Sequence, residues 1–219
     1  EIALIEKLGV TIKTNSPIGA KIQWKTLREN YDAVFISAGS HKGRKLGVPG
    51  EDSVSGIVDS VNFLRDANLG VLKKAPKRVI VVGGGNSAID SARTSLRLGA
   101  SDVTILYRRS IEEMPAHKEE IKDAEDEGVK FTYLSTPTAV RPAENNSTEL
   151  ECVRMQLSEA DESGRRKPAP VEGSNFTLPA DLVITAISQT PDFSFIPKDT
   201  GIELTRDNLI KTSPYTMET

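Results

Sequence analysis

The sequence predicts an α/β fold built on a parallel β-sheet, and three features of one stretch support this prediction. Residues 78–82 (RVIVV) form an unbroken β-branched run, which is typical of a strand buried on both faces of a parallel sheet. The glycine turn GGGNSA follows directly, and a helical pattern then continues to Gly99. A second run, VTILY at 103–107, completes a strand, turn, helix and strand of about thirty residues.

Further elements are expected on both sides of this unit. Alternating short apolar runs and polar turns over 138–178 predict an antiparallel β-meander. Apolar spacing and glycine stops predict helices over 58–69 and 116–127. A short apolar run predicts one more strand over 129–133.

Two other predicted strands share a pattern. The runs at 33–36, within YDAVFISAG, and at 182–186, within ADLVITAIS, each follow an aspartate closely and end in small residues. Small residues at the carboxyl end of a parallel strand let a ligand approach the backbone, which is where open α/β sheets bind ligands. The alternative is that both runs are ordinary core strands that meet turns.

Composition excludes several classes of function. The 219 residues carry a formal charge of −3, so we expect no nucleic-acid partner, and no apolar run approaches the roughly 18 residues of a membrane span. The default compartment is therefore the cytoplasm. The single cysteine, Cys152, excludes an internal disulfide, and His41 and His117 have no partners at ligand spacing, so we expect no metal site. No residue pattern indicates a catalytic acid, base or nucleophile.

The glycine turn predicts a dinucleotide site. Gly83-x-Gly85-x-x-Ala88 fits the G-x-G-x-x-G/A pattern, in which the first glycine makes the turn and the second lets a diphosphate approach the backbone. The backbone amides of Asn86 and Ser87 would then face the diphosphate, at the positive end of the helix dipole.

The end of the second strand predicts which dinucleotide binds. NAD sites have an acidic residue about 20 positions after the turn, whereas NADP sites have arginine there, and this sequence has Arg108 and Arg109. Two guanidinium groups can bind a 2′-phosphate bidentately, so we expect NADP(H). The alternative is that Arg108 and Arg109 are a solvated pair on the surface and bind no phosphate. The run Arg165-Arg166-Lys167 is equally basic, but it lies in a predicted loop, where we expect a solvated surface.

Beyond these motifs, the residues resemble a known family. The stretch from GGGNSAIDSARTS to YRRSIEEMPAHKEE, the preceding YDAVFISAGSHKGRKLGVPGED and the following ADLVITAISQTPD are similar to the small (beta) subunit of NADPH-dependent glutamate synthase and related two-dinucleotide flavoproteins. The resemblance covers nearly the whole chain. Carried over by position, it assigns the glycine turn to Gly83, Gly84 and Gly85, the helix start to Asn86 and Ser87, and the phosphate-binding arginines to Arg108 and Arg109.

The same resemblance implies a segment beside the nicotinamide that includes Ser188 and Gln189, although the family usually has glycine where this chain has Ser188. It also implies a Rossmann-like NADP(H)-binding domain, residues 71–204, inserted in a partial FAD-binding domain formed by residues 1–70 and 205–219. The family's first FAD fingerprint and its closing segment are not in the sequence. We therefore expect a fragment that is incomplete for catalysis.

The function implied by the resemblance is hydride transfer from NADPH to FAD, the FAD being bound by the full-length protein. Electrons then pass to an iron–sulfur partner or a large catalytic subunit. A non-catalytic dinucleotide-binding module, serving as a sensor or assembly domain, is the alternative, and flavin absorbance of the purified protein separates the two. A methyltransferase fits poorly, because an arginine pair stands where an adenosine-binding acid is expected.

Overall fold

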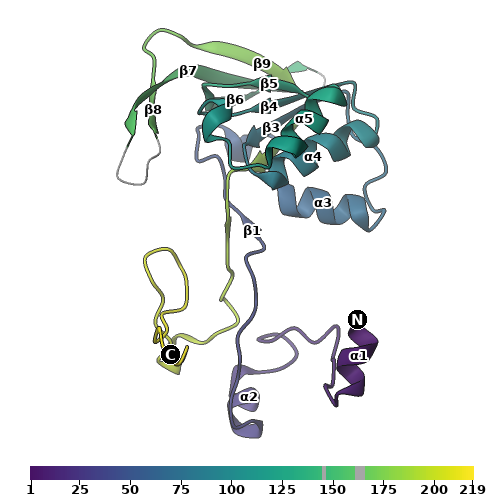
Figure 1. The fold of residues 1–219 in the computed structure, drawn as a ribbon, viewed down its shortest axis with the longest axis vertical. Coiled ribbons are helices and arrows are strands. Elements are labelled where there is room, and N and C mark those ends of the chain that lie inside the picture. Colours follow the sequence, from purple (N-terminus) through teal and green to yellow (C-terminus); the bar gives the residue numbers. More distant parts are fainter. Residues whose placement is uncertain (145–146, 161–165) are drawn as a thin grey trace. The chain divides into compact units, whose positions relative to one another are not determined.

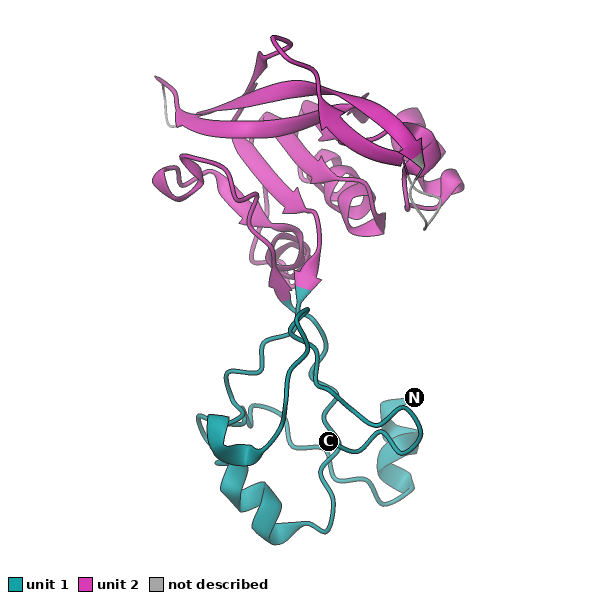
Figure 2. Cartoon of the chain, turned by 90° about the vertical axis from the view of Figure 1, so that its left-hand side faces the viewer, with its two compact units in different colours: residues 1–41, 190–219 teal, residues 42–189 magenta. Residues whose placement is uncertain are grey.

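The computed structural model of the chain forms two compact units (Figure 2). Unit 1 consists of residues 1–41 and 190–219, and unit 2 of residues 42–189, so unit 2 is inserted in the sequence of unit 1. The structure describes residues 1–144, 147–160 and 166–219.

Unit 2 contains most of the regular secondary structure. Its helices are α3 (Ser60–Asn68), α4 (Asn86–Arg97) and α5 (Lys118–Asp126). Its strands before the meander are β1 (Lys42–Gly43), β2 (Ile57–Asp59), β3 (Arg78–Gly83), β4 (Asp102–Leu106) and β5 (Lys130–Thr132). The later strands are β6 (Ser135–Pro142), β7 (Thr148–Ala160), β8 (Arg166–Pro170), β9 (Phe176–Ala180), β10 (Leu182–Ala186) and β11 (Gln189–Thr190), the last of which crosses the boundary into unit 1.

The central sheet is parallel, with strand order β2-β10-β3-β4-β5. Strands β3, β4 and β5 follow each other in one direction, whereas β10 and β2 lie on the other side of β3. The order therefore reverses at β3, and such a reversal opens a crevice at the carboxyl ends of the strands. There, Gly83 of β3 is in register with Ala186 of β10.

The two faces of the sheet have different covers, as Figure 1 shows. Val79 and Val81 of β3 pack in the core formed with α3, α4 and α5, whereas Ile80 and Val82 pack against the meander. All four side chains are at most 5% exposed. Burial on both faces explains why the β3 sequence is continuously apolar instead of alternating.

The meander is antiparallel, with β7 pairing with β6, β8 and β9. Leu150 and Cys152 of β7 are fully buried beneath it. Burial raises the pKa of the Cys152 thiol to about 12, so the thiol stays protonated and packs as a small apolar side chain. The α/β class, with a parallel sheet and an antiparallel meander, is thus confirmed.

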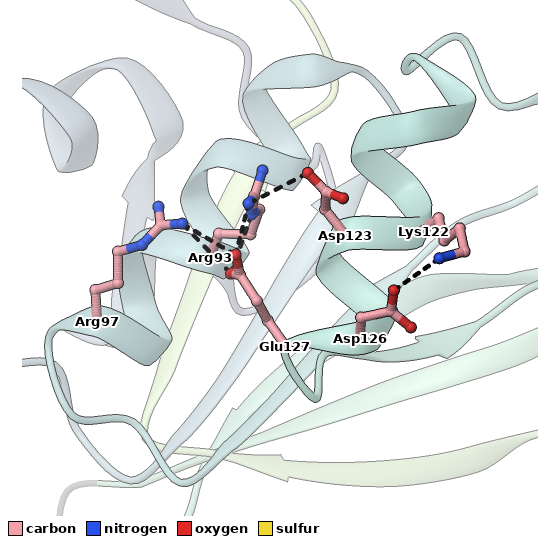
Figure 3. A network of polar contacts seen from close by, with 6 residues as sticks. All are labelled: Arg93, Arg97, Lys122, Asp123, Asp126 and Glu127. Atoms are coloured by element: carbon pink, nitrogen blue, oxygen red, sulfur yellow. Dashed lines mark hydrogen bonds and ion pairs between the residues drawn. The ribbon is translucent and has the colours of Figure 1, made fainter.

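A polar network joins α4 to the end of α5 (Figure 3). Arg93 Nε and NH2 donate to the two carboxylate oxygens of Glu127 at 3.0 and 2.5 Å, and Arg97 NH2 donates to Oε1 at 3.1 Å. The hydrogen bonds from Arg93 hold the pKa of Glu127 below its ordinary value. The network fixes α5 beside the helix that begins at the glycine turn.

Replacing Glu127 by Gln is expected to lower the free energy of unfolding by about 1 kcal/mol at pH 7. Because the folded-state pKa of Glu127 is lowered, its contribution is complete above the ordinary glutamate pKa of about 4.3 and is lost as the pH falls through the folded-state pKa. Denaturant titrations between pH 3 and 7 measure this. Asp126→Asn is the control, since Asp126 pairs at 2.9 Å with Lys122 of the same helix and both side chains are exposed. Equal losses for the two variants at pH 7 would contradict the prediction.

Unit 1 has little regular structure. It contains α1 (Ile2–Lys7) and α2 (Trp24–Asn30), and the buried Trp24 packs against Phe195 with ring centroids 6.4 Å apart. The strand expected at 33–36 is absent, and Phe35 in this segment is 88% exposed. A β-strand needs a neighbour for its backbone hydrogen bonds, and no strand of the described residues pairs with this run. Among the described residues, no helix has both the length and the apolar character of a membrane span.

The bounds of the compact units differ from those of the segments expected from the sequence. Residues 42–70, expected with the FAD-type segment, lie in unit 2 because β2 pairs with β10 and α3 packs on the parallel sheet. At the other end, unit 2 ends at Gln189 and not near 204. The chain therefore enters and leaves unit 2 at two segments that pair with each other, β1 and β11.

Candidate functional site

The glycine turn joins β3 to α4, and its three glycines meet different surroundings. A Cβ on Gly83, at φ +151°, would lie 2.3 Å from the carbonyl oxygen of Ala186. A Cβ on Gly84 would lie 2.5 Å from Cε2 of Tyr107. A Cβ on Gly85 would meet no atom within 4 Å. The first two glycines are therefore required by protein packing, and only Gly85 presents open backbone.

The residues after the turn divide between structure and surface. Ala88 is fully buried where α4 packs on the sheet. The side chain of Asn86 accepts a hydrogen bond from the backbone N–H of His117 at 3.2 Å, and Ala116 N donates to the carbonyl of Gly84 at 3.1 Å. These bonds hold the segment that leads into α5 against the turn. Asn86 and Ala88 thus support the turn, and their side chains do not line the cavity described next.

A cavity of about 680 Å³ lies at the carboxyl ends of β3, β4 and β10. Its size is within the usual range for small-molecule and cofactor sites. Eight of the ten residues expected at a dinucleotide site line it: Gly83, Gly84, Gly85, Ser87, Arg108, Arg109, Ser188 and Gln189. The structure therefore brings together three segments that are up to 106 positions apart in the sequence, counted from 83 to 189.

The two arginines follow β4. Arg108 is exposed, and Arg109 is partly buried and donates its Nε–H to the carbonyl oxygen of Arg166 at 3.0 Å. Both guanidinium-bearing residues line the cavity, at the end of the strand next to the glycine turn. The arginine pair that the sequence indicates is thus among the residues that line the cavity.

A carboxylate also lines this part of the cavity. Glu113 ends a short 3₁₀ helix (Ile111–Glu113) that begins with a capping box, in which Glu113 accepts from the backbone N–H and the hydroxyl of Ser110 at 3.1 and 2.6 Å. Arg166 Nε donates to the same carboxylate at 2.6 Å. These bonds hold the pKa of Glu113 below its usual value, and the bond from the Ser110 hydroxyl has the largest effect. It is therefore ionised and fully engaged at neutral pH.

The opposite part of the cavity is bordered by a loop that sequence reasoning did not identify. Arg44, Leu46 and Val48 line the cavity, and Arg44 N donates to the carbonyl of Ser188 at 3.0 Å. The carboxylate of the buried Glu51 accepts from the backbone N–H groups of Leu46 and Gly47 at 2.7 and 2.8 Å and fixes the loop. The available signal was Glu51 itself, an acid that follows Pro49 and Gly50 and can bind loop amides.

The residues that line the cavity are suited to binding a phosphorylated ligand. Among residues 1–144, 147–160 and 166–219, no group of three or more His, Cys, Asp or Glu side chains is placed to hold a metal ion. Open backbone at Gly85, the start of α4 and two arginines are instead suited to a ligand with several phosphate groups. A dinucleotide phosphate fits these features, because one part of the cavity offers backbone and another offers guanidinium groups.

Comparison with known proteins agrees with this geometry. The model of the pyridine nucleotide-disulphide oxidoreductase family matches residues 4–219. The NADP(+)-dependent formate dehydrogenase subunit beta of Moorella thermoacetica is 46% identical over 221 residues, which cover 100% of this chain and 31% of that protein. The NADPH-Fe(3+) oxidoreductase subunit beta of Geobacter sulfurreducens is 46% identical over 215 residues, covering 97% of this chain and 32% of that protein.

The resemblance expected from the sequence is also confirmed. The glutamate synthase [NADPH] small chain of Halomonas elongata is 35% identical over 220 residues, which cover 95% of this chain and 46% of that protein. This chain therefore spans less than half the length of these three relatives.

A solved structure shares the fold. FprA of Mycobacterium tuberculosis in complex with NADPH aligns with a TM-score of 0.69 at 21% identity, over 86% of this chain and 56% of that chain. Since the family model matches nearly every residue, from 4 to 219, the chain belongs to the pyridine nucleotide-disulphide oxidoreductase family.

Proposed function

We propose that the cavity at the carboxyl ends of β3, β4 and β10 binds NADP(H). The amides at the start of α4 and the open backbone of Gly85 hold the diphosphate. Arg108 and Arg109 hold the 2′-phosphate of the adenosine ribose, and Ser188 and Gln189 border the nicotinamide. The observation that carries the proposal is that Gly85 has nothing within 4 Å of a Cβ position while both arginines line the same cavity.

The chain's own residues position the dinucleotide. When bound, the nicotinamide supplies a hydride, and this chemistry depends on orientation more than on an acid or base. The apolar side chains of Leu46 and Val48 exclude water from one wall of the cavity, and the Glu51 carboxylate keeps their loop in place.

In the whole protein, we propose that hydride passes from NADPH to FAD and that electrons continue to an iron–sulfur partner or a large catalytic subunit. The names of the relatives support this, since two are beta subunits of an NADP(+)-dependent and an NADPH-dependent enzyme. Unit 1 is proposed as part of the FAD-type domain. Its exposed apolar side chains support that role, because Leu8, Phe35 and Tyr215 are 80%, 88% and 94% exposed and would be available to pack against the rest of such a domain.

Calorimetric titration of the purified protein with NADPH and NADH tests the dinucleotide site. NADPH is expected to bind at least about tenfold more tightly, which corresponds to about 1.4 kcal/mol, less than one charge-assisted arginine–phosphate contact contributes. Equal affinities would contradict the 2′-phosphate site. Absence of binding by both dinucleotides would contradict the proposed function as a whole.

A further inference from the structure

The start of β8 contacts Arg109 and Glu113 of the cavity wall from a distant part of the sequence. Arg166, the first residue of β8, is separated by 53 positions from Glu113 and by 57 from Arg109. Its guanidinium binds Glu113, through Nε at 2.6 Å and NH2 at 2.5 Å, and its carbonyl oxygen accepts from Arg109 Nε at 3.0 Å. One residue of the meander thus contacts both a carboxylate and an arginine of the cavity wall.

The negative charge of the Glu113 carboxylate is unfavourable for phosphate binding in this cavity. It lines the same cavity as Arg108 and Arg109, and an uncompensated negative charge there would repel a phosphate and compete for the guanidinium groups. Its side chain is only 10% exposed, so water screens it weakly. Ser110 satisfies part of its hydrogen-bonding capacity but brings no charge. Arg166 is the cation bound to Glu113 within the part of the chain that the structure describes.

The hydrogen bond from Arg109 to the carbonyl of Arg166 orients the Arg109 guanidinium. Because Nε donates to the carbonyl of Arg166, the plane of the Arg109 guanidinium is fixed. Its terminal amino groups have no hydrogen-bond partner among residues 1–144, 147–160 and 166–219. A fixed plane with two available amino groups is the arrangement required for bidentate binding of a phosphate.

We propose that Arg166 is a positioning residue for the 2′-phosphate subsite: its side chain neutralises Glu113, whereas its backbone carbonyl, which side-chain variants retain, orients Arg109. The proposal rests on the proposed binding of NADP(H) in this cavity. It assigns a recognition role to the start of β8, where the sequence predicts a solvated loop, and it makes the preference for NADPH depend on Arg166, which is not among the residues that line the cavity.

The test is calorimetric titration with NADPH and NADH of five variants of the purified protein: Arg166→Ala, Lys167→Ala, Glu113→Gln, the Glu113→Gln/Arg166→Ala double variant and Arg108→Ala. Arg166→Ala is expected to reduce NADPH affinity by at least about fivefold and to leave NADH affinity nearly unchanged, because only NADPH brings charge to the subsite. Lys167→Ala removes one positive charge from the adjacent position of β8, where the exposed side chain has no ion pair in the described structure, and is expected to have little effect. In a Glu113→Gln background, Arg166→Ala is expected to lose most of its effect.

Three results would overturn the proposal: equal effects of Arg166→Ala and Lys167→Ala, equal loss of NADPH and NADH affinity, or an undiminished effect in the Glu113→Gln background. If Arg166→Ala does not fold, Arg166→Lys and Arg166→Gln replace it, and only the lysine variant is expected to retain the preference. Arg108→Ala separates this proposal from the proposed function. If Arg108→Ala also leaves the preference unchanged, then the dinucleotide assignment itself fails.

Discussion

NADPH binding is expected to weaken by roughly 10- to 150-fold when Arg108 is replaced by alanine, and by a similar factor when Arg109 is replaced, while NADH binding changes by less than roughly threefold. Each guanidinium lost removes a charge-assisted contact with the 2′-phosphate, which NADH does not have. The contact is worth about 1.5–3 kcal/mol. Calorimetric titration at low salt measures both affinities directly.

The matched control is Lys74→Ala, which removes an exposed positive charge from the segment before β3. It is expected to alter neither affinity by more than roughly twofold, because it lies outside the residues that line the cavity. The preference of the unchanged protein for NADPH should also shrink as salt is raised, since Arg108 is exposed. Equal losses of NADPH and NADH affinity in the arginine variants would contradict the assignment.

Alanine substitutions at two glycines of the same turn are expected to have very different effects on stability. Gly83→Ala is expected to destabilise the fold by roughly 3 kcal/mol or more, because the added Cβ would lie 2.3 Å from a backbone oxygen at a φ of +151°. Gly85→Ala is expected to change the free energy of unfolding by less than about 1 kcal/mol, since its Cβ meets nothing within 4 Å and its φ is −92°. Thermal unfolding compares the two variants.

Gly85→Ala, which is expected to affect stability little, is expected to weaken dinucleotide binding strongly. Its added Cβ occupies the space through which a diphosphate approaches the backbone, so both NADPH and NADH are expected to lose at least about tenfold in affinity. The loss is common to both because both carry the diphosphate. If Gly85→Ala binds both dinucleotides as the unchanged protein does, the diphosphate lies elsewhere.

The strand, turn, helix and strand over 78–107 were predictable because the features that specify them lie next to one another in the sequence. The β-branched run, the glycines and the helix stripe are adjacent in the chain, and the parallel sheet buries β3 on both faces as that run requires. The predicted strand at 182–186 has the observed bounds of β10. Asp181 before it accepts the backbone N–H of Arg78 at 3.0 Å, which aligns the start of β10 with the start of β3.

The same pattern at 33–36 did not give a strand. YDAVFISAG and ADLVITAIS are similar in composition, but only the second lies between two strands that can pair with it. A strand sequence specifies a face and a length, whereas the neighbour that completes its hydrogen bonds is a property of the whole fold.

The candidate site was partly predictable for the same reason. The turn and the arginine pair lie about 20 positions apart in one unit, so their spacing in the sequence reports their proximity. Arg166 contacts the cavity-lining residues Arg109 and Glu113 only because the meander folds back, and the loop that contains Arg44 lines the cavity only because the chain enters unit 2 there. For Arg166, a basic run in a predicted loop gave no sign of the carboxylate that it pairs with. Arg165 lies outside the described residues.

The pairing of β1 with β11 has a mechanical consequence. Unit 2 is tethered to the rest of the polypeptide by two adjacent covalent links, and the residues next to those links, Arg44 on one side and Ser188 with Gln189 on the other, form part of the cavity wall. Any pull transmitted along the backbone is therefore delivered directly to residues of the cavity wall.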